Sequence, residues 1–199
     1  MPEKKIISPI LLAAGQSKRF GSDKLIHPVS YQGKTQPLIL QTLAPWLAVF
    51  SEVNVVIREN NHDLKKLLKQ CEFSARVNLI IAHNADLGMS ASLIGGIKAN
   101  QEAAAWLIGL ADMPFINKVV IKKSLIALQA GALITQAEFG CRRGHPVGFS
   151  YQFLPQLLAL HGDKGAKQII DASAHLITPV ISPDAGIYRD IDTKENLAI

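Results

Sequence analysis

The chain has 199 residues, a length typical of one domain, and we expect residues 1–199 to form a single domain. Hydrophobic residues make up 48% of it and charged residues 19%, a composition that excludes a disordered chain. The net charge of +5 favours an anionic partner, and because the longest basic runs are pairs, a phosphorylated small molecule is favoured over nucleic acid.

Short apolar runs alternate along the chain with helical patterns. The first run, 6–13, is apolar almost throughout, as in a strand that is covered on both faces. Four later runs predict further strands: 53–57, 77–82, 106–110 and, more weakly, 132–135. The spacing of apolar residues predicts helices around 43–50 and 64–71, with Asn60 or Asn61 as the N-cap of the second.

This alternation predicts a three-layer α/β/α Rossmann-like fold with a mostly parallel central sheet. The last third of the chain is less regular, and its apolar runs at 146–151 and 176–181 are expected to add edge strands. In a sheet of this kind, ligands bind outside the carboxyl ends of the strands. The loops after Ala13, Ala82 and Leu110 are therefore expected to hold the functional site.

Several other classes of protein are excluded. Cys71 and Cys141 are far apart and form no CxxC motif, so neither a disulfide scaffold nor a zinc ribbon is available. The long uncharged stretch 35–51 contains two prolines and falls short of the roughly 20 apolar residues of a membrane span. Residues 1–5 lead straight into the first strand without a convincing signal-peptide cleavage site. We expect a cytoplasmic protein that does not bind a membrane.

The loop at 12–24 has the composition of a phosphate-binding loop. Gly15 and Gly21 permit unusual backbone angles, and Arg19 and Lys24 bring positive charge to the same turn. Known glycine-rich motifs do not fit, because five residues rather than four separate the two glycines and GxGxxG is absent. A merely basic connecting loop, with Lys24 in solvent, is the alternative.

Six short segments, spread over nearly the whole chain, add a more specific signal. They are LAAGQSKRFGSDK at 12–24, GMSASL at 88–93, LADMP at 110–114, RGHPV at 143–147, GDKGAK at 162–167 and DIDT at 190–193. In this order they resemble the motifs of nucleotidyltransferases similar to the molybdenum cofactor cytidylyltransferases. The first motif of that family reads LAAGxSxRMGxxK, and Phe20 stands here in place of its Met.

The resemblance implies an enzyme that transfers CMP from CTP to the phosphate of a molybdopterin-type cofactor and releases pyrophosphate. It places six residues around the triphosphate: Leu12, Ala13, Ala14, Gly15, Arg19 and Lys24. Lys24, Arg19 and Asp112 are the expected catalytic residues. Ser90 and Ser92 are expected to contact the base or sugar, although either could instead cap the following helix. Ala14 favours CTP, because guanylyltransferase relatives have glycine there.

The resemblance also implies a magnesium ion. Asp112 ends an apolar strand, where its carboxylate would face the ligand and also contact the nucleotide, and Mg²⁺ prefers hard oxygen ligands. The second ligand is expected from the C-terminal region, with Asp192 favoured, Asp190 as the alternate, and capping of a following helix as the other role. The acceptor is expected to be bound by four residues: Arg143, His145, Asp163 and Lys167. For His145, a tight turn is the structural alternative.

Other functions stay open on the sequence alone. One is cytidylyl transfer to another phosphorylated small molecule, such as methylerythritol phosphate; another is a guanylyltransferase that uses GTP. A non-catalytic nucleotide- or cofactor-binding protein is a third, although the intact Lys24, Asp112 and Asp192 argue against it. A molybdoenzyme client or its chaperone is a further expected partner. A serine hydrolase is excluded, because residues 88–92 lack the last glycine of GxSxG.

Overall fold

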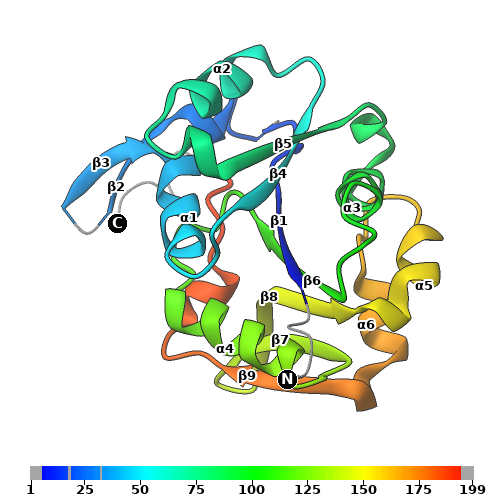
Figure 1. Ribbon diagram of the computed structural model, residues 1–199. Coiled ribbons are helices and arrows are strands. Elements are labelled where there is room, and N and C mark those ends of the chain that lie inside the picture. The colour runs from blue at the N-terminus through cyan, green and yellow to red at the C-terminus, as the bar shows by residue number, and fades with distance from the viewer. Residues whose placement is uncertain (1–5, 18, 32, 194–199) are drawn as a thin grey trace.

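A seven-stranded sheet forms the centre of the computed structural model, which describes residues 6–17, 19–31 and 33–193 (Figure 1). The strands are β1 (Ile7–Leu12), β4 (Val53–Arg58), β5 (Val77–Ala82), β6 (Ala105–Leu110), β7 (Ile134–Phe139), β8 (Arg142–Ser150) and β9 (Ile177–Ile181). Their order across the sheet is β5-β4-β1-β6-β8-β7-β9. All neighbours are parallel except that β8 runs antiparallel to both β6 and β7. The predicted mostly parallel sheet is confirmed.

Helices cover both faces of this sheet, which gives the three layers seen in Figure 1. One face carries α1 (Leu38–Leu47), α2 (His62–Gln70) and α4 (Lys118–Gln129). The other face carries α3 (Met89–Lys98), α5 (Leu154–Leu158) and α6 (Lys167–Ala172). None of the described helices is long and apolar enough to cross a membrane.

Strand β1 shows why its sequence is apolar at successive positions. Successive side chains point to opposite faces, so Ile10 packs into the core under α3 while Leu11 packs into the core under α1. Neither residue is exposed to solvent. Each core is filled by a fully buried indole, Trp46 on the α1 side and Trp106 on the α3 side. Full burial of an aliphatic side chain such as Ile10 or Leu11 contributes roughly 1.5–3 kcal/mol to the stability of the fold.

Several elements differ from the sequence-based expectation. The run at 146–151 belongs to β8, which lies inside the sheet between β6 and β7 rather than at an edge. The run at 176–181 does form an edge strand, β9. Helix α1 begins at Leu38, earlier than predicted, and the hairpin of β2 (Pro28–Tyr31) and β3 (Lys34–Pro37) was not predicted. The helix expected after Thr193 lies outside the described residues.

The cap predicted for α2 is confirmed. Of the two candidates, Asn61 is the N-cap, and its side-chain oxygen accepts a hydrogen bond from the Leu64 N–H at 3.2 Å. The same Asn61 side chain also reaches the loop after β1, as described below. Asn61 therefore links the N-terminus of α2 to the loop after β1.

Candidate active site

The loop after β1 is held by short-range hydrogen bonds and by α2. Ser17 has a positive φ of 50°, and its hydroxyl accepts a hydrogen bond from the Lys24 backbone N–H at 3.3 Å. One Asp23 oxygen accepts from the Leu25 N–H at 3.0 Å, and the other accepts from the Asn61 amide at 2.6 Å. These contacts fix the backbone on both sides of Lys24, so its side chain leaves the loop from a defined position.

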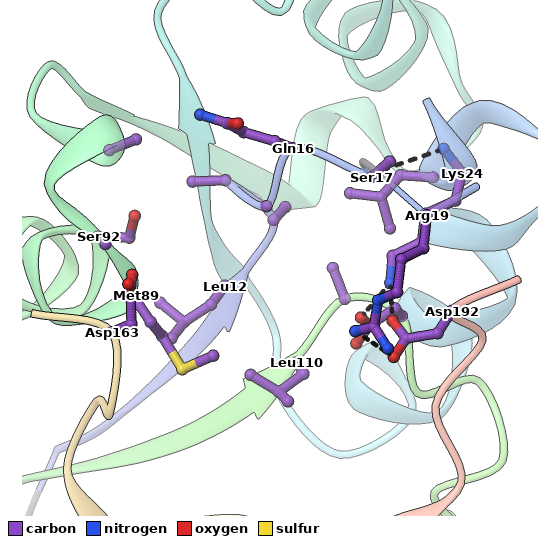
Figure 2. A pocket seen from close by; sticks show the side chains of 18 of the residues that line it. Leu12, Gln16, Ser17, Arg19, Lys24, Met89, Ser92, Leu110, Asp163 and Asp192 are labelled. Carbon is purple, nitrogen blue, oxygen red and sulfur yellow. Dashed lines mark hydrogen bonds and ion pairs between the residues drawn. The ribbon is translucent and has the colours of Figure 1, made fainter. Parts of the chain in front are cut away.

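Lys24 brings a fixed positive charge into the cleft. Its Nζ lies 2.7 Å from Asp112 Oδ2 and 2.9 Å from Asp192 Oδ1, and its side chain is 10% exposed. Burial disfavours the ammonium form, but the two carboxylates outweigh burial and raise the pKa of Lys24. Arg19 lies 2.7 Å from Asp192 with a side chain that is 74% exposed. Figure 2 shows Arg19 and Lys24 on the same side of the pocket, near Asp192.

Three carboxylates meet where β6 ends. Asp112 follows β6 closely, and its backbone C=O accepts a hydrogen bond from the Ile191 N–H at 3.0 Å. This bond brings the C-terminal segment against β6, so that Asp112, Asp190 and Asp192 each offer an oxygen within 4.8 Å of the others. The Asp112 Oδ1 atom is buried and has no hydrogen-bond partner among the described residues. Such a donor set fits a hard divalent cation.

The pKa values of the two C-terminal carboxyl groups shift in opposite directions. Partial burial, together with the negative charge of Asp192, raises the pKa of Asp190. Burial also acts on Asp192, but the hydrogen bond and charge of Lys24, with the charge of Arg19, outweigh it and lower the pKa of Asp192. Of the two alternatives left open by the sequence, Asp192 is therefore the one that the cations hold in its ionised form.

Lys24, Asp112 and Asp192 line a cavity of about 520 Å³ at the carboxyl end of β1, called here the first cavity. Most residues singled out for the nucleotide and the metal line it: Leu12, Ala13, Ala14, Gly15, Arg19, Lys24, Ser92, Asp112 and Asp192. Gln16 and Asp86 also line it and were missed, and Gln16 Nε2 donates to Asp86 Oδ1 at 2.8 Å. Figure 2 shows Ser92, Met89 and Asp163 on the side away from Lys24.

In the segment 88–93, the structure excludes the capping alternative for both serines and places only Ser92 in the first cavity. Helix α3 has Gly88 as its N-cap, with no side-chain cap hydrogen bond, so neither Ser90 nor Ser92 caps it. Ser90 is fully buried and its hydroxyl donates to the His161 C=O at 3.2 Å, so it does not contribute to the first cavity. The reason is helical periodicity: residues two positions apart lie about 200° apart around the axis, and only Ser92 faces the cavity.

A second cavity, of about 480 Å³, adjoins the first, and Leu12, Met89 and Leu110 line both. Three of the residues expected to bind the acceptor line the second cavity: Arg143, His145 and Lys167. Asp163 differs from the expectation, because it lines the first cavity. Gly88 explains this placement: its positive φ and missing side chain let residues 162–163 pack directly against it, which holds Asp163 beside α3.

Strand β8 has a bulge in the wall of the second cavity. Its pairing with β7 shifts after Gln136 and resumes at Gly144, which leaves His145 and Pro146 outside the ladder. Burial of the ring lowers the pKa of His145, so its imidazole is neutral at pH 7. Gln136 also lines this cavity and was missed, since a single glutamine inside a strand carries no sequence signal of its own.

The sequence matches a family that fits this geometry. The profile of the MobA-like NTP transferase domain matches residues 9–176. The chain belongs to this family. It is therefore a nucleotidyltransferase. The match ends before Asp190 and Asp192, so the place of these two residues in the site rests on the geometry described above.

A relative and several solved structures are similar to this chain over nearly its whole length. The chain is 27% identical over 192 residues to the "Purine catabolism protein PucB" of Bacillus subtilis (strain 168), covering 94% of this chain and 91% of that protein. Rv0371c from Mycobacterium tuberculosis H37Rv has a TM-score of 0.80 at 19% identity, over 97% of this chain and 96% of its own. A structure of Rv0371c has also been solved as a complex with manganese.

A further solved structure bears a cytidylyl name. The 4-diphosphocytidyl-2C-methyl-D-erythritol synthase of Anaerococcus prevotii DSM 20548 has a TM-score of 0.73 at 17% identity, over 98% of this chain and 94% of its own. At these sequence identities, the similarity to the solved structures shows a common fold and nothing about the reaction.

Proposed function

We propose that this nucleotidyltransferase transfers CMP from CTP to the phosphate of a molybdopterin-type cofactor and releases pyrophosphate. The observation that carries the proposal is the junction of the two cavities. The first holds Lys24, Asp112 and Asp192, the second holds Asp190, and the three carboxylates converge between them. A triphosphate in the first cavity and an acceptor phosphate in the second would meet at this junction.

The reaction needs positioning and charge rather than covalent help from the protein. An oxygen of the acceptor phosphate attacks the α-phosphorus, the bond to the α,β-bridging oxygen breaks, and pyrophosphate leaves with the electron pair. Because the second pKa of a phosphate monoester is near 6, the attacking oxygen is already anionic at neutral pH, and no general base is required. The barrier comes from bringing anions together, which the ammonium of Lys24 and the guanidinium of Arg19 offset.

Asp112 and Asp192, with Asp190 beside them, would hold the Mg²⁺ ion. When bound, that ion supplies positive charge to the phosphate oxygens as a Lewis acid. Lys24 contacts Asp112 and Asp192 directly, so it keeps their charges close together without an ion. Backbone N–H groups of Ala14 and Gly15 would act on the triphosphate from the β1 side, since small residues there let a ligand approach closely.

Two features favour CTP and the pterin-type acceptor. Ala14, where a glycine is found in guanylyltransferase relatives, is 7% exposed and lines the first cavity. Arg143 and Lys167 of the second cavity supply positive charge suited to a phosphorylated acceptor. GTP as the donor, a sugar phosphate acceptor and a non-catalytic binding role are the competing functions. A molybdoenzyme or its chaperone would be the recipient of the product.

Pyrophosphate release decides between these functions. The purified protein is incubated with Mg²⁺, each of the four triphosphates in turn, and either a molybdopterin-type cofactor or methylerythritol phosphate, and nucleotide binding is measured in parallel. We expect release with CTP and little with the others. Release with GTP alone would show that GTP, and not CTP, is the donor. Release only with methylerythritol phosphate would show that the acceptor is a sugar phosphate. Tight nucleotide binding without release for any acceptor would identify a binding protein.

A substitution at the carboxylate junction tests the site itself. Asp112→Asn should lower turnover by about 10²-fold or more with a modest loss of nucleotide affinity, because the lost charge acts mainly as charge builds up in the transition state. Asp63→Asn, the same change at an exposed position on α2, is the matched control and should retain the wild-type rate. A wild-type rate for Asp112→Asn in Mg²⁺ would contradict the proposed site.

A further inference from the structure

The second cavity contains a buried amide oxygen that lacks a hydrogen-bond donor. Gln136 is 9% exposed, and its Oε1 has no partner among the described residues. The Nδ1 atom of His145, across the bulge in β8, is buried in the same way without a partner. Buried polar atoms are almost always hydrogen-bonded in folded proteins, because leaving them unpaired costs free energy. Both residues line the second cavity, where a ligand could supply the missing donors.

The position of Gln136 on strand β7 determines on which face of the central sheet its side chain lies. Side chains alternate along β7, and the neighbouring Thr135 lies on the other face, near Leu128 of α4. Gln136 shares its face with Ile134, which packs in the core under α3. Gln136 and His145 are therefore polar positions on the sheet face that forms the floor of the second cavity.

The apolar part of the second cavity limits the shape and polarity of a ligand that would contact Gln136 and His145. Leu93 from α3, Ile108 and Val147 from the sheet, and Ile170 from α6 give it apolar walls. A hydroxyl group placed against these four side chains would find no hydrogen-bond partner there, at a cost in free energy. A flat ring buries both of its faces against apolar side chains and needs hydrogen bonds only at its edge.

We propose that Gln136 is a specificity-determining residue of the acceptor site, whose side-chain carbonyl accepts a hydrogen bond from an N–H group of a flat nitrogen heterocycle. The proposal rests on the proposed function, because it takes the second cavity as the acceptor site. His145 gives the ring edge a second polar contact, and Arg143 and Lys167 suit the anionic end of the same molecule. A hydroxyl group of a sugar phosphate can also donate to Gln136, but a sugar phosphate has no flat apolar faces to bury against Leu93 and Ile170, so the cavity as a whole favours the heterocycle.

Direct binding tests this role without relying on turnover. The intrinsic fluorescence of 6-hydroxymethylpterin monophosphate is titrated with wild type, Gln136→Leu and Gln136→Glu, and 2-C-methyl-D-erythritol 4-phosphate is added as a competitor. Gln136→Leu removes the accepting oxygen at similar volume and should weaken pterin binding about tenfold, the size of one lost hydrogen bond. Gln136→Glu keeps an accepting oxygen and should retain most of the affinity. The dissociation constant for CTP should be unchanged in both variants.

Thr135→Val is the matched control. Its hydroxyl is also buried without a partner among the described residues, yet it faces away from the cavity, so pterin affinity should stay at the wild-type level. Wild-type pterin affinity in Gln136→Leu, or stronger binding of the sugar phosphate than of the pterin by wild type, would overturn the role of Gln136. Failure of the proposed function has a different signature: no pyrophosphate with any triphosphate, whatever the variants do to pterin binding.

Discussion

The ammonium group of Lys24 lies between two carboxylates that reach it from distant parts of the chain. Asp112 is 88 positions away and Asp192 is 168 positions away, and both contact its Nζ within 2.9 Å. Without a cation between them, these partly buried carboxylates would repel each other. Lys24 therefore has two roles in the proposed mechanism: it neutralises the site before the ligands bind and faces the triphosphate afterwards.

Replacing this ammonium group tests both roles. In Lys24→Met, triphosphate affinity and turnover should fall together, because one cation serves both binding and the transition state. Without nucleotide, Mn²⁺ should raise the Tm of the variant more than that of wild type, since the carboxylates have lost their internal cation. Differential scanning fluorimetry with and without Mn²⁺ measures this. Lys122→Met, at an exposed site on α4, is the control. An unchanged nucleotide dissociation constant in Lys24→Met would show that Lys24 does not bind the triphosphate.

His145 makes stability depend on pH. Burial lowers its pKa in the folded state, so the unfolded chain binds a proton more readily. The stability that His145 gives in its neutral form is thus fully present above its unfolded pKa of about 6.5 and is lost as the pH falls through the lower folded value. In His145→Gln, the decline of the unfolding free energy between pH 7 and pH 5 should be smaller. Urea titrations across this range, with His175→Gln as a surface control, measure the difference, and identical slopes for wild type and His145→Gln would contradict it.

At the scale of elements, the start of α3 depends on a glycine. Gly88 has a φ of +106°, and a Cβ there would lie 2.7 Å from the Gly162 carbonyl oxygen and would also overlap the Asp163 carboxylate. Gly88→Ala should therefore destabilise the protein and move Asp163 away from its place in the first cavity, which weakens nucleotide binding. Gly95→Ala, inside the same helix with open space around it, should instead stabilise by about 1 kcal/mol. Chemical denaturation and nucleotide titration of both variants check this pair, and equal stability for the two would refute it.

The sequence predicts well those elements that are determined by local patterns. Strands β1, β4 and β6 are apolar because both of their faces are mostly buried. The bounds of the edge strand β5, which is only partly buried, were also predicted without error. The place of β8 could not be predicted in this way, since position in a sheet depends on which partner a strand finds. Ser90 shows a related limit: the motif contains two serines, and only the rotation of α3 determines which of them faces the cavity.

At the scale of the whole molecule, the sequence predicts the motifs but not how they come together. Lys24, Asp112 and Asp192 were singled out from the resemblance to a family, and their ion pairs exist because the fold brings three distant segments to one edge of the sheet. Gln136 shows the opposite case. It belongs to none of the motifs, and only its unpaired oxygen in a shared cavity draws attention to it.

The C-terminal segment completes the site through a buried anchor. Ile191, between Asp190 and Asp192, is fully buried, and its N–H donates to the Asp112 carbonyl oxygen at 3.0 Å. Truncating this side chain leaves a cavity and should cost about 2–5 kcal/mol. Because the anchor also holds Asp192 against Lys24, Ile191→Ala should lower turnover beyond the effect of lost stability.

Val180→Ala is the comparison that separates these two effects. Val180 is 5% exposed in β9 and lies outside both cavities, so its truncation should lower stability with little change in turnover. Urea denaturation gives the stability of each variant, and pyrophosphate release is measured at a temperature where both are fully folded. A lower rate of pyrophosphate release in Ile191→Ala but not in Val180→Ala would show that Ile191 positions Asp192. Equal rates in the two variants would mean that Asp192 holds its place through its ion pairs with Lys24 and Arg19, independently of the anchor.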